Sequence, residues 1–253
     1  MDRRRFVGLG ALAAAGCQLG CRGGGPAQPQ VGRGDGRLQS TWAAPSSTLG
    51  PGVHELGLGA LRDGYVRIPD GYDPATPAPL SLLLHGAGRD AYEWEGGFPV
   101  FDELGLTVLS VDSRDASWDL RYGAFGADVT FIDLALAWTF ARCNVDATRL
   151  GIAGFSDGAS YALSLGLTNG DLFSHVLAFS PGFMDTVQRN GTPPIFLTHG
   201  TDDQVLPVAF SRGMSEQLAS EGYEVRFEEF AGGHTLPYAV GQAGFQWLVQ
   251  GAP

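Results

Sequence analysis

The chain has few basic side chains, few cysteines and no recognisable metal-binding motif. Its 253 residues carry 16 Lys and Arg against 27 Asp and Glu, which gives a net charge of −11. Nucleic-acid binding needs a basic surface that neutralises phosphates, so nucleic acid is excluded as an expected partner. Neither an H-E-x-x-H nor a C-x-x-C motif occurs, and we therefore expect no metal and no cofactor.

Cysteine is also scarce. Only Cys17, Cys21 and Cys143 are present, and no disulfide framework can be built from this number. Cys143 stands alone in the region expected to fold, where we predict a small buried hydrophobic side chain.

No apolar run is long enough to span a membrane by itself. Residues 7–16 form a ten-residue apolar stretch behind Arg3, Arg4 and Arg5, which is typical of an export signal of the twin-arginine type. The stretch Ala14-Ala15-Gly16-Cys17 resembles a bacterial lipoprotein cleavage site, with Cys17 as a possible lipid anchor. We predict an export signal at residues 1–21 and a periplasmic, envelope-associated or secreted protein.

Residues 22–52 are rich in Gly and Pro with little apolar periodicity, and we predict a flexible linker there. Residues 53–253 are then one catalytic domain, a normal size for a single α/β unit. The apolar spacing predicts strands at residues 64–69, 80–86, 106–112, 149–154, 175–181, 194–200 and 223–230, and helices at residues 125–143, 157–168, 207–222 and 238–249. Continuous apolar strands alternating with helices predict an α/β fold with a mostly parallel sheet and helices on both faces.

Near the middle of the chain, Gly154-Phe155-Ser156-Asp157-Gly158 fits the G-x-S-x-G pattern of a nucleophile elbow. Because 38 residues are Gly, the five letters alone identify little. Their context is more informative, since a predicted strand precedes Ser156 and a predicted helix follows it. This strand–turn–helix setting holds a serine Oγ out of the sheet.

A carboxylate and a histidine follow in the order that such a serine requires. Asp202 and Asp203 come after the predicted strand at 194–200, and His234 follows the last predicted strand. A serine hydroxyl is a poor nucleophile until a histidine accepts its proton and a carboxylate orients that histidine. We therefore expect a Ser-His-Asp triad of Ser156, His234 and one of the two aspartates.

Together, LLLHGAG, GFSDG, HGTDDQVLP and GGHTLP resemble the α/β-hydrolase superfamily over roughly residues 64–249. The motifs are most similar to secreted poly(3-hydroxybutyrate) depolymerases and feruloyl or acetylxylan esterases, and to the carboxylesterase/phospholipase group. The resemblance implies Asp203 as the triad acid, with Asp202 as a loop residue. It also implies that the backbone N–H groups of Ala87 and Asp157 form the oxyanion hole.

The same resemblance gives His85 and His199 structural roles and places Trp118 near the substrate, although packing in the core is an equal alternative for this indole. The Asp157 side chain is expected to point away from the pocket, since its charge would oppose a nearby oxyanion.

The expected function is hydrolysis of carboxylic esters, short-chain, aryl or polymer-linked, through an acyl-enzyme. Residues 181–194 are too few for a large helical lid, so an open cleft is expected. A peptidase or amidase of the same fold and an exported binding protein without turnover are the alternatives. The oligomeric state is not indicated by the sequence.

Overall fold

The computed structural model describes residues 34–42, 44–59, 61–185 and 188–251. The predicted export signal at residues 1–21, including Cys17, lies outside the described residues. Within the described part of the chain, no helix is both long and apolar enough to cross a membrane.

In this part of the chain, eight strands form one open sheet in the order β1-β2-β4-β3-β5-β6-β7-β8. The strands are β1 (Gly52–Glu55), β2 (Gly64–Ile68), β3 (Ala78–Leu84), β4 (Thr107–Val111), β5 (Val145–Phe155), β6 (His175–Phe179), β7 (Ile195–Gly200) and β8 (Val225–Phe230). Strand β2 pairs antiparallel with both β1 and β4, and the pairings from β4 through β8 are parallel. The predicted mostly parallel sheet is confirmed.

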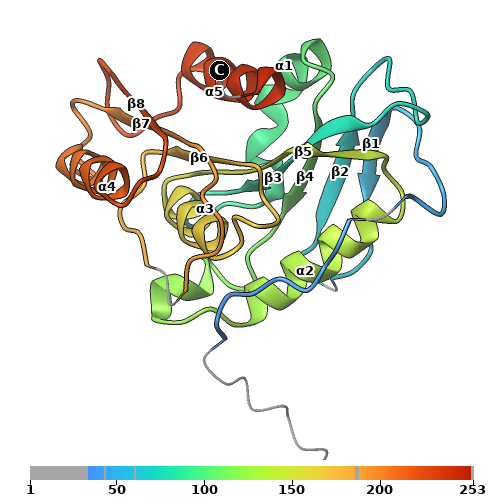
Figure 1. Ribbon diagram of the computed structural model, residues 1–253, viewed down its shortest axis with the longest axis horizontal. Coiled ribbons are helices and arrows are strands. Elements are labelled where there is room, and N and C mark those ends of the chain that lie inside the picture. The colour runs from blue at the N-terminus through green and yellow to red at the C-terminus, as the bar shows by residue number, and fades with distance from the viewer. Residues whose placement is uncertain (1–33, 43, 60, 186–187, 252–253) are drawn as a thin grey trace, which may run out of the picture. The chain divides into compact units, whose positions relative to one another are not determined.

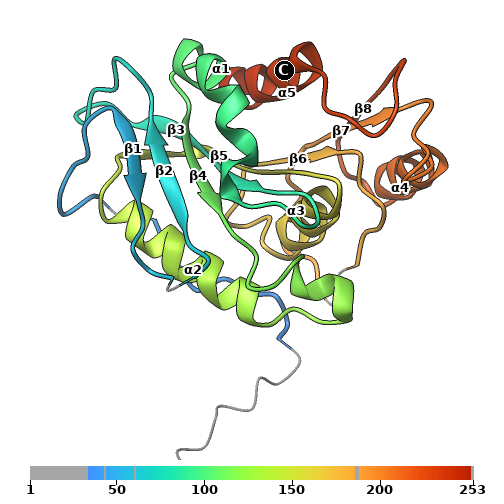
Figure 2. The ribbon, with the colours of Figure 1, turned by 180° about the vertical axis from the view of Figure 1, so that it is seen from behind.

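Helices cover both faces of this sheet, as Figures 1 and 2 show. They are α1 (Phe98–Glu103), α2 (Ala127–Phe140), α3 (Asp157–Thr168), α4 (Ala209–Ser220) and α5 (Tyr238–Gln250), with 3₁₀ helices η1 (Ala91–Gly97) and η2 (Asp119–Tyr122). One apolar core joins the sheet to α2, α3 and α4, and a second core joins the opposite face to η1, α1 and α5.

The central strands are buried along almost their whole length, because helices cover them on both sides. Strands β3, β4, β6 and β7 show no exposed residue, and they are built mainly from Leu, Val, Ile, Ala and Phe, as expected of parallel strands between two helical layers. Cys143 is also buried as a free thiol, as predicted. Ligand sites in such sheets form at the carboxyl ends of the parallel strands.

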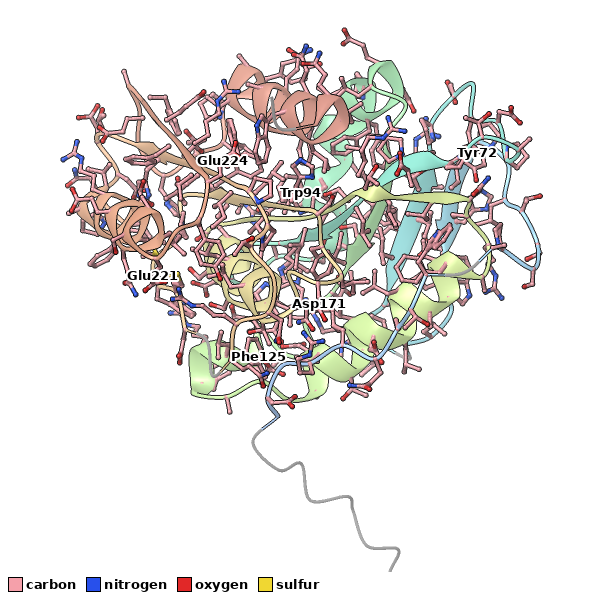
Figure 3. All side chains as sticks on the ribbon, in the orientation of Figure 1. Tyr72, Trp94, Phe125, Asp171, Glu221 and Glu224 are labelled. Atoms are coloured by element: carbon pink, nitrogen blue, oxygen red, sulfur yellow. The ribbon has the colours of Figure 1, made fainter. Side chains whose placement is uncertain are left out.

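The prediction of a flexible linker at residues 22–52 is wrong for the part around Leu38, because that part packs against the rest of the domain. Arg37 pairs with Asp171 at 2.7 Å between Nη2 and Oδ2, and Leu38 is buried with its N–H bonded to the Asn169 side chain at 2.9 Å. Figure 3 labels Asp171 beside this segment. Side chains distant in sequence supply these bonds, so the local Gly and Pro content does not reveal them.

Between β6 and β7, the described residues form no helix. This connection therefore adds no helical lid over the carboxyl edge of the sheet within the described part of the chain.

Candidate active site

Ser156 lies in a strained turn between β5 and α3. Its φ is 59° and its ψ is −121°, a backbone conformation that costs free energy for any residue with a Cβ and that recurs at functional sites. The turn places Ser156 at the carboxyl edge of the sheet, immediately before the N-terminus of α3.

The two glycines of the motif are required by close backbone contacts. A Cβ on Gly154 would lie 2.2 Å from the Gly158 carbonyl oxygen, and a Cβ on Gly158 would lie 2.3 Å from the Leu84 carbonyl oxygen. Neither position can hold a larger residue without backbone movement. The G-x-S-x-G pattern is therefore explained by packing of the turn against the end of β3.

Ser156, His234 and Asp203 are hydrogen-bonded in series. The Ser156 Oγ lies 2.8 Å from His234 Nε2, and His234 Nδ1 lies 2.6 Å from Asp203 Oδ2. With the proton on Nδ1, the imidazole donates to the carboxylate and accepts the serine hydroxyl proton at Nε2. This is the geometry in which a histidine acts as a base toward a serine.

Of the two adjacent aspartates, Asp203 contacts the histidine and Asp202 is exposed. Burial alone would raise the pKa of Asp203, but the N–H groups of Leu206 and Val205 and the contact with His234 outweigh burial and lower this pKa. Both N–H groups donate to Oδ1 at 2.8 Å. They therefore fix the carboxylate in its ionised form with Oδ2 facing the imidazole.

His199 supports the same loop, consistent with a structural role. Its side chain is fully buried, with Nε2 2.7 Å from the Leu206 carbonyl oxygen and Nδ1 2.7 Å from Ser211 Oγ. His199 Nε2 also lies 3.2 Å from Asp203 Oδ2. His199 thus connects the loop that carries Asp203 to Ser211 of α4.

Two backbone N–H groups near Ser156 have no hydrogen-bond acceptor among the described residues. They belong to Asp157 at the N-terminus of α3 and to Ala87 after β3. The loop that carries Ala87 is close, since a Cβ built on Gly86 would lie 3.6 Å from Ser156 Cβ. Unpaired N–H donors beside a nucleophile can stabilise a developing oxyanion.

His85 anchors the first residue of this loop. Its Nδ1–H donates to the Gly86 carbonyl oxygen at 2.7 Å, and its Nε2 accepts the Ser113 N–H at 2.9 Å. Burial lowers the pKa of His85, and the nearby Arg62 guanidinium lowers it further. The neutral ring therefore orients the loop, as the resemblance implied, and has no contact with Ser156 Oγ.

The next residues of the loop are held by other contacts. The Gly86 N–H donates to Glu93 Oε2 at 2.6 Å, and the Gly88 N–H donates to the Ala116 carbonyl oxygen at 2.7 Å. The Ala87 N–H between them is left without a partner in the described part of the chain, while both neighbouring amides are fixed.

The Asp157 carboxylate is buried in an ion pair. Its Oδ2 accepts the Ser117 hydroxyl at 2.8 Å and a hydrogen bond from Arg121 Nη1. The Asp157 side chain is 9% exposed, whereas that of Arg121 is 52% exposed. The charge that follows the nucleophile is therefore offset by a guanidinium from η2.

The prediction that Trp118 lines the substrate pocket is wrong. Trp118 is 1% exposed, its Nε1–H donates to the His85 carbonyl oxygen at 2.8 Å, and its ring packs against His85 and Tyr161 with centroids 4.9 and 5.0 Å away. The indole satisfies its one donor inside the core, so packing is the alternative that applies.

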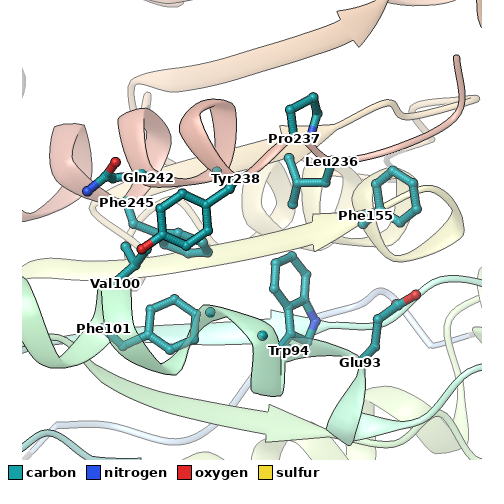
Figure 4. Close-up of a pocket in the computed structure, with 13 residues that line it drawn as sticks. Glu93, Trp94, Val100, Phe101, Phe155, Leu236, Pro237, Tyr238, Gln242 and Phe245 are labelled. Carbon is teal, nitrogen blue, oxygen red and sulfur yellow. The ribbon is translucent and has the colours of Figure 1, made fainter. Parts of the chain in front are cut away.

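A pocket of about 330 Å³ adjoins the triad on the side of η1, α1 and α5. Its lining residues are Glu93, Trp94, Gly96, Gly97, Val100, Phe101, Phe155, Leu236, Pro237, Tyr238, Gly241, Gln242 and Phe245. Figure 4 shows Glu93 and Phe155 at one end and Gln242 and Val100 at the other. The Phe155 ring packs on His234 with centroids 5.0 Å apart, which places the first end beside the triad.

Sequence reasoning did not identify this pocket or Glu93. Residues 91–103 supply about half of the pocket wall. This segment contains Gly96, Gly97 and Pro99, whose poor helix propensity argued against the helical turns that it forms. No group of three or more His, Cys, Asp or Glu among the described residues is arranged to hold a metal ion.

Comparison with known proteins gives one consistent family likeness. Residues 129–243 match the Phospholipase/Carboxylesterase family. The chain is 29% identical over 170 residues to feruloyl esterase C of Emericella nidulans, covering 64% of this chain and 61% of that protein. It is 28% identical over 169 residues to the probable feruloyl esterase C of Aspergillus niger, covering 63% and 60%. The chain thus spans about three fifths of the length of these curated relatives.

Solved structures show the same fold. S-formylglutathione hydrolase of Staphylococcus aureus superposes with a TM-score of 0.64 at 17% identity, covering 78% of this chain and 98% of that one. A ferulic acid esterase of Anaeromyces mucronatus, solved with ferulic acid, gives 0.60 at 19% identity, covering 79% and 90%. The sheet, the turn at Ser156 and these likenesses together show that the chain has the α/β-hydrolase fold and is similar to esterases of that fold.

Proposed function

We propose that this protein hydrolyses carboxylic esters through Ser156, His234 and Asp203. The observation that carries the proposal is the pair of hydrogen bonds that connects these side chains, 2.8 Å from serine to histidine and 2.6 Å from histidine to aspartate. Esterase names among the sequence relatives support the same reaction class.

In the proposed mechanism, Ser156 Oγ attacks the ester carbonyl carbon while His234 Nε2 takes the hydroxyl proton. Asp203 stabilises the resulting imidazolium. The negative oxygen of the tetrahedral intermediate is held by the N–H groups of Ala87 and Asp157. The intermediate then expels the alcohol, which receives the proton from His234, and leaves the acyl group on Ser156.

Hydrolysis of the acyl-enzyme repeats these roles with water as the nucleophile. His234 Nε2 takes a proton from the water molecule as its oxygen attacks the acyl carbon, and the proton returns to Ser156 Oγ as the acid departs. The helix dipole of α3 favours negative charge at the same position as the two N–H donors.

The pocket favours esters with an apolar or aryl portion. Its walls carry the rings of Trp94, Phe101, Phe155 and Phe245, and aromatic walls bind flat apolar groups well. Because the relatives are named feruloyl esterases, methyl ferulate is a suitable test substrate beside simple p-nitrophenyl esters. Among short-chain, aryl and polymer-linked esters, we therefore propose those with an apolar or aryl portion as substrates.

The proposal is tested by the hydrolysis of p-nitrophenyl butyrate and methyl ferulate by the wild-type chain and three variants. Ser156→Ala should reduce kcat on the order of 10⁴-fold, because it removes the nucleophile. Asp203→Ala should also reduce kcat strongly, whereas Asp202→Ala is the matched control and should retain nearly full activity because its carboxylate is exposed.

Equal turnover by the wild-type chain and Ser156→Ala would contradict this function. Turnover of anilide substrates in place of esters would favour an amidase, and binding of esters without turnover would favour a binding protein on a hydrolase scaffold. We further propose export of the protein, with lipidation of Cys17 as one possible outcome of signal cleavage. These residues lie outside the described part of the chain.

A further inference from the structure

A carboxylate that the proposed mechanism does not use lies at the end of the pocket beside the nucleophile. A Cβ built on Gly86 would lie 3.6 Å from Ser156 Cβ and 3.6 Å from Glu93 Oε2, so the nucleophile and the carboxylate are both neighbours of this glycine. The Glu93 side chain is only 21% exposed. Any substrate group that enters this end of the pocket from Ser156 therefore passes close to Glu93.

Glu93 is also the only residue with a charged side chain among the described residues that line the pocket. Its nearest basic side chain is Arg89, with Nε 3.6 Å from Glu93 Oε1, and this arginine is 70% exposed. Asp90 adds a second negative charge nearby, and His234 is the other titratable group that acts on Glu93. The remaining lining is aromatic, aliphatic or neutral polar.

The carboxylate is held in place by a backbone donor. The Gly86 N–H lies 2.6 Å from Oε2. Burial raises the pKa of Glu93 above its usual value, and the Gly86 N–H and Arg89 limit this rise by favouring the ionised form. A partly buried carboxylate repels other anions more strongly than a fully exposed one does, because water screens it less.

We propose that Glu93 determines substrate specificity by excluding esters that carry a negative charge on the group bound in this pocket. The inference rests on the proposed ester hydrolysis and adds the charge of the substrate to it. Neutral apolar or aryl groups fit the lining, whereas a carboxylate would be desolvated beside Glu93. Such repulsion against a wrong ligand is a general source of specificity.

Glu93→Gln isolates the charge from the positioning of the loop. The glutamine Oε1 can still accept the Gly86 N–H, but it carries no charge. Glu93→Ala removes both the charge and the acceptor, so it should lower kcat for every ester through the loop that carries Ala87. Glu95→Gln is the matched control, because Glu95 is an exposed residue of η1 and the net charge changes equally.

The experiment compares kcat/KM for two pairs of esters, each with a neutral and an anionic member. One pair varies the acyl group, p-nitrophenyl hexanoate against p-nitrophenyl hydrogen adipate. The other varies the leaving group, the acetate of p-hydroxybenzamide against the acetate of p-hydroxybenzoate. For each protein, kcat/KM for the neutral ester is divided by kcat/KM for the anionic ester of the same pair. A general loss of activity in a variant lowers both values and cancels in this ratio.

The expected result is a fall of about tenfold in this ratio, for at least one pair, in both Glu93→Gln and Glu93→Ala, with no change in Glu95→Gln. The responding pair shows which side of the ester occupies the pocket. Unchanged ratios for both pairs in Glu93→Gln, with active hydrolysis of the neutral esters, would overturn this inference and leave the proposed function intact. No hydrolysis of any ester by the wild-type chain would overturn both.

Discussion

Asp157 follows the nucleophile directly, and its negative charge would repel the negative oxygen in the proposed oxyanion hole. Its own backbone N–H is one of the two proposed oxyanion donors, while its carboxylate is an anion within the same residue. The structure resolves this conflict by pairing the carboxylate with Arg121 and Ser117. Both partners come from the segment between β4 and α2.

Arg121→Ala should therefore impair catalysis more than substrate binding. Removing the guanidinium leaves the Asp157 anion less compensated beside the oxyanion, and we expect kcat for p-nitrophenyl butyrate to fall about tenfold while KM changes little. Steady-state kinetics measure both constants. Arg226→Ala is the control, since Arg226 is 50% exposed on β8 and pairs with Glu228, away from Ser156 in sequence and in the sheet.

The double variant Arg121→Ala/Asp157→Asn distinguishes a charge effect from a folding defect. Because the asparagine carries no charge, it should restore most of the lost kcat if uncompensated charge is the cause. A double variant no faster than Arg121→Ala alone would contradict the electrostatic explanation.

Single residues were predictable from sequence where a motif fixed their spacing. Ser156 and His234 stand in short motifs after predicted strands, and the resemblance of HGTDDQVLP to the esterase motif favoured Asp203 over Asp202. Glu93 and Arg121 belong to no such motif and reach the site only through tertiary contacts. Trp118 was placed wrongly because a large amphipathic ring suits a core and a binding site equally well, and sequence does not separate the two.

At the scale of elements, the long periodic segments were the predictable ones. The predicted helix at residues 157–168 coincides with α3 (Asp157–Thr168), and the other predicted helices and strands overlap observed elements. Strand β1 was not predicted, since its alternation covers only four residues, Gly52–Glu55. The turns of η1 and α1 were hidden by glycines and a proline with poor intrinsic helix propensity.

The segment around Leu38 shows the limit of composition as a guide. A buried leucine, the Arg37–Asp171 ion pair and backbone N–H groups bonded to Asn169 and Asp133 hold this segment. Asp133 Oδ1 accepts the N–H groups of Gln39 and Ser40 at 2.8 and 2.7 Å. Local sequence reports none of these contacts, since their partners lie far along the chain.

Leu38→Ala should destabilise the protein because it leaves a cavity under this segment. We expect a loss of about 2–3 kcal/mol in the free energy of unfolding, the usual cost of truncating a buried leucine. Urea denaturation followed by circular dichroism measures this loss. Gln39→Ala is the matched control, since the Gln39 side chain is exposed, and it should change stability little. Equal stability of the two variants would show that the segment is not docked in solution.

At the scale of the whole molecule, the parallel sheet brings separate parts of the sequence together. Ser156 follows β5, Asp203 follows β7, His234 follows β8 and Ala87 follows β3. Parallel strands end at one edge of the sheet, so four loops separated by up to about 150 residues of sequence meet there. This topology could be predicted from the alternation of strands and helices, whereas the shape and charge of the pocket depend on side-chain packing.

The proposed function depends above all on Ser156 being an activated nucleophile. Burial raises the pKa of the Cys143 thiol to about 12, so this side chain is a poor competing nucleophile. The most direct test treats the wild-type chain, Ser156→Ala and His234→Ala with a fluorophosphonate and measures intact mass and the labelled peptide. We predict one phosphonyl group on Ser156 of the wild-type chain, none on Ser156→Ala and very slow labelling of His234→Ala. An unlabelled wild-type chain, or labelling at another residue, would contradict it.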